Sequence, residues 1–310
     1  MSKYAYGPVA SRRLGRSLGV DLVPMKTCNL NCVYCQLGPT AQTTMVRADY
    51  APAAEVVADV RQRILKGPEP DFITLGGSGE PTLHRSFGSI AANIAELTDV
   101  PIALLTNGML FYLPEVRAAT APVNLVLPSL DAGDEETFRA INRPHAGLTL
   151  EMLVSGLEAL RDEFLGQIWL EVFIVEGLNT SDEQIDRISA CIERIRPDRI
   201  QLNTAVRPPA ESYVQPASME RLEEICTRLG PGAEIIASGR QYHVVEGAER
   251  RLEDVLEMIR RRPCTVDDVA DGLGISRSAA IRDLRRLLDD GTVHIRQRRF
   301  DTYYEATKDS

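Results

Sequence analysis

Short apolar runs alternate with stretches of helical periodicity along most of this 310-residue chain. The apolar runs cover residues 19–24, 72–76, 101–106, 123–130, 168–175 and 199–206, and the helical stretches cover residues 51–66, 85–98, 134–142, 149–164, 181–196 and 217–229. This alternation predicts an α/β fold in which helices cover parallel strands. Six such units fit a partial (β/α)6 barrel, whose functional site would lie at the C-terminal ends of the strands.

A loop with glycine or polar residues follows each predicted strand. These loops cover residues 28–35, 76–83, 106–108, 128–131, 176–179 and 207–209. Glycine in one of these loops alone would indicate an ordinary tight turn. Because all six loops would meet at the same rim, we expect them to build the functional site.

The first of these loops contains three cysteines with C-x3-C-x2-C spacing. They are Cys28, Cys32 and Cys35, and Tyr34 stands immediately before the third. Three thiolates on one short segment can hold three irons of a cubic 4Fe-4S cluster and leave the fourth iron open. The alternatives are zinc and a disulfide, but no second pair of Cys or His ligands lies nearby in the sequence. The spacing therefore favours an iron-sulfur cluster.

The remaining cysteines do not repeat that spacing. Cys191 and Cys226 fall on apolar faces of predicted helices, as core cysteines do, and Cys264 stands alone before a predicted helix cap. We therefore expect no auxiliary cluster. The N-terminal residues lack an apolar signal segment and no apolar run is long enough to span a membrane, so we expect a cytoplasmic protein whose cysteines stay reduced.

The cysteine spacing, with an aromatic residue before the third cysteine, resembles the signature loop of the radical S-adenosylmethionine (SAM) enzymes. The resemblance implies that the three cysteines are the catalytic cluster ligands and that the open iron binds SAM. It also implies that one-electron reduction splits SAM to give a 5′-deoxyadenosyl radical. The implied cofactors are therefore a 4Fe-4S cluster and SAM.

Residues 76–83, GGSGEPTL, resemble the glycine-glycine-glutamate motif with which these enzymes bind the methionyl amino group of SAM. Glycines permit close approach of a ligand to the backbone, and Glu80 would either contact SAM or brace the loop. Polar residues after the next two strands would contact the ribose or the methionyl carboxylate, with ordinary turn chemistry as the alternative. The predicted SAM-binding residues are Tyr34, Gly77, Ser78, Gly79, Glu80, Asn107, Ser129 and Asp131.

Residues 7–246 resemble a narrower group, the Fe-S oxidoreductases that include the tRNA wybutosine-synthesis radical enzymes. The resemblance rests on GPVASRRLGRSLGVDLVP before the cluster loop, on INRPHAGL (141–148) and on NTAVRPP (203–209). The chain shows neither the flavodoxin-like domain nor the second cluster motif of wybutosine enzymes. We therefore expect an external one-electron reductant, either a flavodoxin or a ferredoxin.

Several cationic side chains lie beside loops of the predicted rim. Guanidinium groups suit bidentate contacts with carboxylates or phosphates, although surface ion pairs would explain each one equally well. The predicted substrate-side residues are Arg12, Arg13, Arg143, His145 and Arg207.

The pattern changes to helix, helix, short turn, helix and β-hairpin over residues 247–310. This order resembles a winged helix-turn-helix and predicts a second domain after a barrel domain at residues 1–246. Pro263 would end its first helix, Thr265 and Ser276 would cap the next two, and Ile281, Leu284 and Leu288 of the third would enter the core. The candidate nucleic-acid contacts are Arg277, Arg282, Arg285, Arg296 and Arg298.

Charge argues against a typical DNA-binding domain here. Residues 249–310 contain 13 Lys and Arg against 13 Asp and Glu, so the first 248 residues carry the whole net charge of −9. These residues lack the excess of positive charge that is typical of a DNA-binding domain. The alternatives to nucleic-acid binding are contact with another protein and packing against the barrel.

The favoured interpretation is a radical SAM enzyme, an oxidoreductase or a transferase, that modifies an RNA or protein brought to the barrel by the C-terminal domain. The alternatives are a DNA-binding regulator that senses SAM or redox state through its cluster, and an activase of a glycyl radical enzyme. The glycine motif and the polar strand ends favour catalysis, because a cluster sensor needs only ligands. Deletion of residues 247–310 is then expected to spare SAM cleavage.

Overall fold

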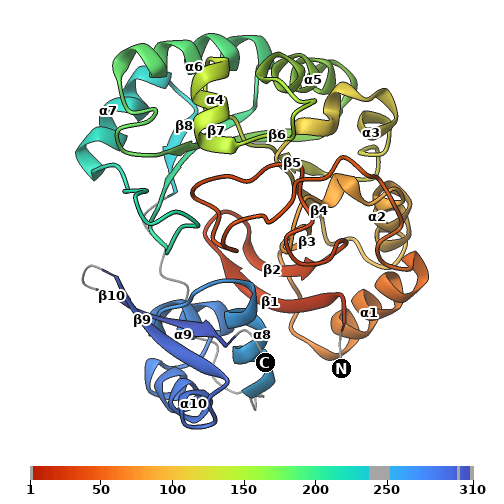
Figure 1. Ribbon diagram of the computed structural model, residues 1–310. Helices are drawn as coiled ribbons and strands as arrows, with labels where there is room; N and C mark the ends of the chain where they lie inside the picture. Colours follow the sequence, from red (N-terminus) through yellow and green to blue (C-terminus); the bar gives the residue numbers. More distant parts are fainter. Residues whose placement is uncertain (1–2, 237–251, 299–300, 308–310) are drawn as a thin grey trace.

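The computed structural model of the chain describes residues 3–236, 252–298 and 301–307. Its main feature is an eight-stranded sheet in which strand order follows chain order (Figure 1). β1 pairs with β2 in antiparallel fashion, and every later neighbour pair from β2 to β8 is parallel. The strands are β1 (Ala5–Ser11), β2 (Gly15–Val20), β3 (Phe72–Leu75), β4 (Ile102–Leu105), β5 (Leu125–Leu127), β6 (Gln167–Ile174), β7 (Arg199–Thr204) and β8 (Ala233–Ile235).

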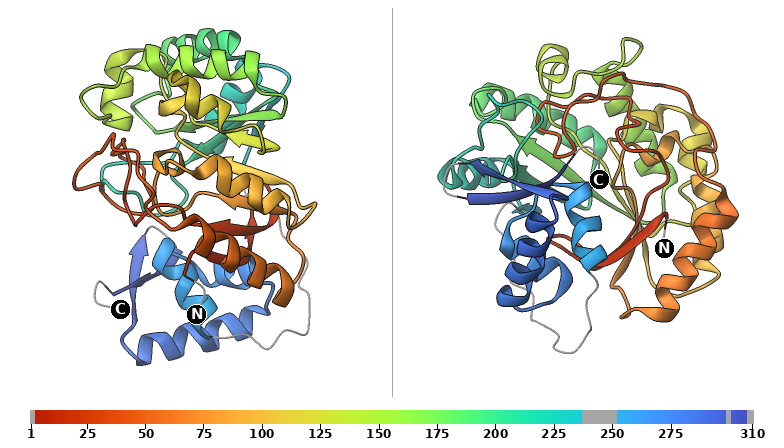
Figure 2. Two further views of the ribbon diagram at one scale, coloured as in Figure 1. Left: turned by 90° about the vertical axis from the view of Figure 1, so that its right-hand side faces the viewer. Right: turned by 60° about the horizontal axis from the view of Figure 1, so that its bottom comes forward.

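Helices follow the parallel strands and lie along the outer side of the sheet (Figures 1 and 2). The six predicted helices all form, and a short additional helix, α3, stands between β4 and β5. The helices are α1 (Ala53–Lys66), α2 (Phe87–Ala95), α3 (Pro114–Ala118), α4 (Glu135–Asn142), α5 (Leu150–Glu163), α6 (Asp182–Ile195) and α7 (Met219–Leu229).

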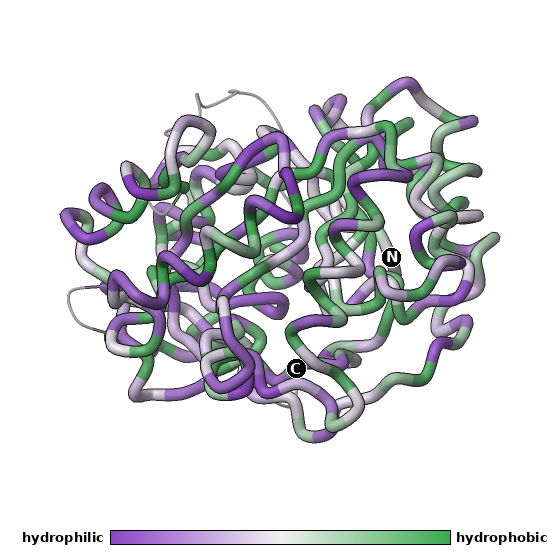
Figure 3. Tube along the Cα trace, turned by 90° about the horizontal axis from the view of Figure 1, so that it is seen from above, coloured by the Kyte–Doolittle hydropathy of each residue, from purple (hydrophilic) through white to green (hydrophobic). Residues whose placement is uncertain are grey.

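α6 illustrates why these segments become helices. The Ser181 side chain accepts a hydrogen bond from the backbone N–H of Gln184, which satisfies an otherwise unpaired group at the helix N-terminus. Ile185, Ile188, Ile192 and Ile195 recur at helical spacing and are buried. Hydrophobic and hydrophilic residues alternate along the outer helices in the same manner (Figure 3).

The predicted strand set lacked two strands at the edges of the sheet. β1 and β8 lie outside the six βα units, because β1 reaches its neighbour through a tight connection instead of a helix and β8 is only three residues long. β2 also ends at Val20, four residues before the predicted end. The parallel α/β core is confirmed, and the strand count of six is corrected to eight.

The C-terminal part contains three helices and a hairpin, in the predicted order. These are α8 (Leu252–Arg261), α9 (Val266–Leu273), α10 (Arg277–Asp289) and the antiparallel pair β9 (Val293–Arg298) and β10 (Asp301–Ala306). Thr265 and Ser276 cap α9 and α10 through their side chains, as expected. We call these elements together the C-terminal unit; the predicted boundary at residues 246 and 247 lies outside the described residues.

A separate apolar core holds the C-terminal unit together. Cys264 and Leu284 are fully buried in it. The prediction for Ile281 is wrong, because this side chain is 42% exposed. Ala280 and Leu287 take the buried positions on α10, since they project toward α8 and α9 while Ile281 projects outward.

The C-terminal unit lies against β1, at the edge of the sheet (Figures 1 and 2). Val9 of β1 packs against its apolar core. Polar contacts also join the two parts: among others, the Arg261 guanidinium pairs with Asp21, Arg207 pairs with Asp268, and the Tyr303 hydroxyl donates to the Val206 carbonyl. The unit is therefore packed against the sheet by apolar and charged contacts.

Membrane-spanning helices are absent from the part of the chain that the structure describes, because none of its helices is both long and apolar enough.

Candidate active site

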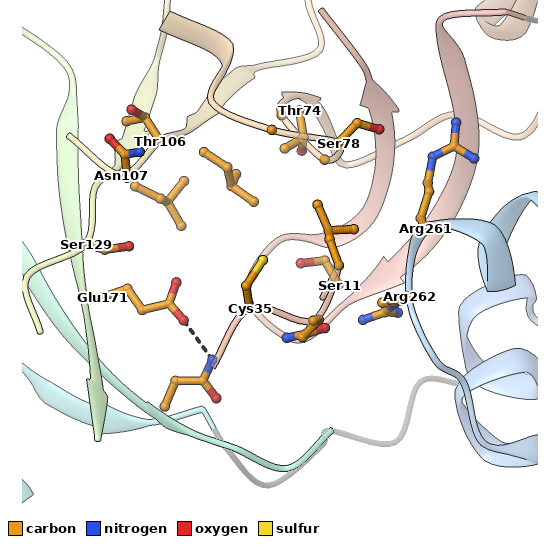
Figure 4. Close-up of a pocket in the computed structure, with 18 of the residues that line it drawn as sticks. Ser11, Cys35, Thr74, Ser78, Thr106, Asn107, Ser129, Glu171, Arg261 and Arg262 are labelled. Carbon is orange, nitrogen blue, oxygen red and sulfur yellow. Dashed lines mark hydrogen bonds between the residues drawn. The ribbon is translucent and has the colours of Figure 1, made fainter. Parts of the chain in front are cut away.

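A cavity of about 440 Å³ opens at the C-terminal ends of the parallel strands. Its lining includes the three clustered cysteines, the glycine-rich loop after β3 and residues from the loops after β4, β5 and β7. Met258, Arg261 and Arg262 of the C-terminal unit also line it. In Figure 4, Thr106, Asn107 and Ser129 lie on one side, and Arg261 and Arg262 lie on the opposite side.

The cysteine loop brings three free thiols to this cavity, and polar N–H groups surround their sulfurs. The Lys26 ammonium lies 3.3 Å from Cys35 Sγ. Asn107 Nδ2 lies 3.6 Å from Cys28 Sγ, and Asn142 Nδ2 lies 3.5 Å from Cys32 Sγ. N–H groups next to thiolate sulfurs stabilise the negative charge and tune a bound cluster. The donor set therefore fits thiolate ligation.

Burial raises the pKa of the Cys28 thiol to about 12 and raises the pKa of Cys32 well above its usual range. Such thiols lose their protons only when a cation replaces them. No three His, Cys, Asp or Glu side chains among the described residues converge closely enough to hold a single metal ion.

Tyr34 and Asp131 form a buried support beneath the cysteine loop. The Tyr34 ring stacks on Phe173 with 3.8 Å between ring centroids, and its hydroxyl donates to Asp131 Oδ2 at 2.5 Å. Asn142 Nδ2 donates to the same oxygen at 2.7 Å and also approaches Cys32. Burial raises the pKa of the Asp131 carboxyl to about 6. Tyr34 lines the cavity, whereas Asp131 lies behind it and holds the residues that touch the sulfurs.

The glycine-rich loop approaches its surroundings too closely for side chains. Gly76 and Gly77 have φ angles of +139° and +149°, which L-residues rarely adopt. A Cβ on Gly77 would lie 2.5 Å from Asp21 Oδ1 and 2.6 Å from the Tyr6 hydroxyl. A Cβ on Gly79 would lie 2.2 Å from the Thr27 carbonyl oxygen. The glycines are therefore needed to bring the loop backbone to the cavity wall.

Glu80 braces this loop against the next one. Its Oε1 accepts hydrogen bonds from Thr82 and from the Thr106 hydroxyl, and its Oε2 accepts from the backbone N–H of Asn107 at 2.7 Å. Of the two roles considered for Glu80, these contacts favour bracing. Asn107 and Ser129 line the cavity, and Asn107 Nδ2 also donates to Asn29 at 2.6 Å.

The five predicted substrate-side residues separate into two groups. Arg12, Arg13 and Arg207 line the cavity. Arg143 pairs with Glu211 and donates to the Tyr213 hydroxyl, and neither Arg143 nor His145 is part of the lining. The structure thus brings three of the five together at the site.

Sequence analysis missed residues that come from β1, β6 and α8. Tyr6, Glu171, Met258, Arg261 and Arg262 all line the cavity. The sequence contains a run of arginines before Pro263, but such a run is typical of the basic C-terminal end of a helix. Only the packing of the C-terminal unit on β1 turns that end toward the cavity.

The candidate nucleic-acid contacts are on the surface of the C-terminal unit. Arg282 and Arg285 are exposed on α10. Arg277 pairs with Asp267, and Arg296 pairs with Glu305. The side chain of Arg298 is outside the described part of the structure.

Known proteins share sequence or fold with this chain. The sequence profile described as the Radical SAM superfamily matches residues 22–189. A Brachyspira hyodysenteriae protein named GTPase Obg is 35% identical over 295 residues, which are 94% of this chain but only 43% of that protein. The UPF0026 protein MJ1312 of Methanocaldococcus jannaschii is 35% identical over 223 residues, 71% of this chain and 69% of that protein.

Solved structures agree on the fold. A radical SAM methyltransferase from Sphaerobacter thermophilus superposes with a TM-score of 0.53 at 18% sequence identity. The superposition covers 71% of this chain and 66% of the methyltransferase. The similarity includes the mostly parallel sheet that carries the cavity.

Proposed function

Because this chain belongs to the radical SAM superfamily and to the UPF0026 family, we propose that it is an enzyme that cleaves SAM reductively and modifies a second substrate. Enzymes of the superfamily use a 4Fe-4S cluster and SAM, which together supply a 5′-deoxyadenosyl radical. One observation carries the proposal: the three thiols and the loop from Gly76 to Glu80 line the same cavity.

Each part of the site has a role in this proposal. Cys28, Cys32 and Cys35 hold three irons, while N–H groups of Lys26, Asn107 and Asn142 stabilise the sulfurs. Gly77 and Gly79 let the loop pack against Tyr6, Asp21 and Thr27, where a Cβ would clash. The backbone of Gly77, Ser78 and Gly79 then binds the amino group of SAM. Asn107 and Ser129 contact the ribose or the carboxylate of SAM. Tyr34 and Glu80 at the cavity wall and Asp131 behind it position these groups.

The C-terminal unit completes the wall of the site. Met258 brings apolar surface to the cavity, and Arg261 and Arg262 bring charge. A closed wall excludes water, which protects a reactive species from side reactions. We propose that residues 1–246 and 247–310 are the two domains and that the second has the winged helix-turn-helix arrangement, supported by the order of α8, α9, α10 and the β9–β10 hairpin. The electron comes from an external flavodoxin or ferredoxin.

Two further statements about the enzyme stay predictions: that it recruits an RNA or protein substrate and that it belongs to the wybutosine group. The two alternative functions, a DNA-binding regulator and an activase of a glycyl radical enzyme, also stay predictions. Ion pairs engage Arg277 and Arg296, whereas Arg282 and Arg285 are exposed. The lining of the cavity by α8 favours the C-terminal unit as a wall of the site over a separate recruiting arm.

The test is an anaerobic assay of three proteins: the wild type, Cys32→Ala and Cys226→Ala. Each is reconstituted with iron and sulfide and mixed with SAM and dithionite, with and without bulk cellular RNA. Cys226 is a matched control because it packs against the main core, away from the cavity lining. Iron-bound absorbance and 5′-deoxyadenosine are measured.

The wild type and Cys226→Ala are expected to form 5′-deoxyadenosine. Cys32→Ala is expected to lose the absorbance and all cleavage of SAM, because the two thiolates that remain are too few to hold the cluster. Normal cleavage by Cys32→Ala would refute the assignment. A bound cluster with no cleavage by the wild type would favour the sensor, and stimulation by RNA would identify RNA as the substrate class.

A further inference from the structure

Three guanidinium groups from three separate elements meet at one side of the cavity. Arg12 follows β1, Arg207 follows β7 and Arg262 follows α8, and all three line the cavity. We call these residues the arginine cluster. They lie far apart in the sequence: the sheet positions Arg12 and Arg207, and the packing of the C-terminal unit on β1 adds Arg262.

The carboxylates near the arginine cluster also accept hydrogen bonds from groups other than arginine. Asp268 accepts from Arg207 at 2.7 Å and also caps α9 by accepting from the backbone N–H of Thr265. Glu171 pairs with Arg13 at 2.6 Å and accepts from Asn203. The neighbouring Arg261 is itself paired with Asp21 at 3.0 Å.

Arg262 differs from its neighbours. Its guanidinium has no hydrogen bond or ion pair with the side chains of the described residues, although it lines the cavity and is not exposed. A charge withdrawn from water without a partner is costly, so such a group is usually completed by a ligand. Arg262 therefore points to an anion that is held in the cavity.

The electrostatics of the cluster agree with this geometry. Burial and the charges of Arg207, Arg13 and Arg262 together lower the pKa of Arg12 to about 10, against the opposing effect of Glu171. Burial and the Arg207 charge also lower the pKa of Arg262. Like charges that repel in a partly dehydrated cavity are relieved by an anion between them.

We propose that the arginine cluster binds the phosphate group of a small-molecule substrate; this rests on the proposed function, which supplies the reaction. Guanidinium groups from three separate elements can together bind more acceptor oxygens than a planar carboxylate offers, and a phosphate has three such oxygens. The position also fits a second substrate. Arg262 lies across the cavity from Asn107 and Ser129, the residues assigned to the ribose or the carboxylate of SAM (Figure 4).

The size of the site favours a small molecule. The cavity of about 440 Å³ is in the usual range for small-molecule sites and has to hold SAM as well. Met258 and Arg261 of α8 line it on the side of the cluster. A phosphate monoester with a compact organic part fits this space, whereas a duplex or a folded protein does not.

The experiment measures binding of inorganic phosphate to the full-length reconstituted protein by the rise in its thermal midpoint and by calorimetry. Wild type, Arg262→Gln and Arg262→Lys are compared with Arg282→Gln, an exposed arginine of the same unit. Acetate replaces phosphate in a second series. SAM and a single-stranded RNA dodecamer are added as competitors in a third series.

Phosphate is expected to bind the wild type and Arg282→Gln saturably, with a rise of roughly 2 °C or more. Arg262→Gln is expected to bind roughly tenfold more weakly or worse. Its midpoint without phosphate is expected to stay close to that of the wild type, because the repulsion from Arg207 and the attraction to Asp268 are lost together. Arg262→Lys should retain part of the affinity. No saturable binding by the wild type, or equal binding by Arg262→Gln, would overturn the proposal.

The other series separate the alternatives. Acetate that binds as tightly as phosphate would overturn the phosphate assignment. Displacement of phosphate by SAM would assign the arginines to the SAM carboxylate, and displacement by the dodecamer would assign them to RNA; either result overturns the proposal. Phosphate binding does not depend on SAM cleavage, so a protein that binds phosphate but makes no 5′-deoxyadenosine would refute the proposed function and leave the phosphate site standing.

Discussion

Gly77 has no room for a side chain, because two polar atoms lie where its Cβ would stand. Asp21 Oδ1 and the Tyr6 hydroxyl are 2.5 and 2.6 Å from that position, and the φ angle of +149° adds backbone strain. Such strain costs roughly 1–3 kcal/mol. Gly77→Ala is therefore expected to displace the loop and to weaken SAM binding by the reconstituted protein roughly tenfold or more, measured by calorimetry.

Gly147→Ala is the matched control for this change. The nearest atom to a Cβ on Gly147 is His145 Nδ1 at 3.8 Å, which is ordinary contact, and the position is exposed. SAM affinity should remain that of the wild type. Equal affinities in the wild type and Gly77→Ala would mean that the loop does not contact SAM.

Residues of the site differ in how well the sequence reveals them. The spacing of Cys28, Cys32 and Cys35 marks the cluster loop, and the glycines after β3 mark the second loop, because each motif is local. Asp131 was placed against SAM, but the fold turns it behind Tyr34. Its direction depends on Phe173 and Asn142, which lie on other elements, and no local pattern records that packing.

At the scale of elements, both carboxylate oxygens of Asp268 hold α9 in place: one accepts from Arg207 and the other from the backbone N–H of Thr265. Burial raises the pKa of Asp268, but the charges of Arg207 and Arg262 and the N–H of Thr265 outweigh burial and hold the pKa at about 2. The folded pKa is thus below the ordinary value of 3.8. The stabilisation is present above pH 4 and is lost as the pH falls toward 2, because the carboxylate is then protonated.

Asp268→Asn is expected to lower the free energy of unfolding by about 2 kcal/mol at pH 7. The difference from the wild type should shrink below pH 4, as followed by denaturant unfolding at a series of pH values. Asp267→Asn is the control, because the side chain of Asp267 is 65% exposed and pairs with the equally exposed Arg277. Its effect should stay within about 0.5 kcal/mol. A difference for Asp268→Asn that does not change with pH would contradict this account.

Elements with strong local signals were predicted well. The N-caps Ser181, Thr265 and Ser276 mark helix starts, and all three accept the expected backbone hydrogen bond. β1 and β8 were missed because edge strands are set by their neighbours more than by their own pattern. The same holds for Ile281, whose apolar character suggests burial while the packing of α10 exposes it.

For the whole molecule, the C-terminal unit and the SAM-binding loop are physically linked. Arg261 pairs with Asp21 Oδ2, and Asp21 Oδ1 accepts from the backbone N–H of Ser78 at 3.0 Å. The same guanidinium lies 3.5 Å over the Tyr6 ring, whose hydroxyl donates to the Gly76 carbonyl. Two routes thus connect α8 to the loop assigned to SAM.

In a chain that ends at residue 246, the rate of SAM cleavage is expected to fall roughly tenfold or more. Asp21 and Tyr6, which hold Ser78 and Gly76, lose their contacts with Arg261, and Val9 loses its apolar cover. This reverses the expectation from the sequence that the unit can be removed without effect on cleavage. The rate of 5′-deoxyadenosine formation is measured in both chains, and circular dichroism checks that the remaining helices are retained. Equal rates would restore the view of a separable domain.

The contact between Val9 and the C-terminal unit also has a meaning for synthesis of the protein. About 240 residues separate Val9 from α8 along the chain. Translation at 5–20 residues per second takes roughly 12–50 s over that distance. Throughout this interval Val9 lacks the apolar core that covers it in the folded protein. The wall that the C-terminal unit adds to the cavity therefore forms only after the whole sheet has been made.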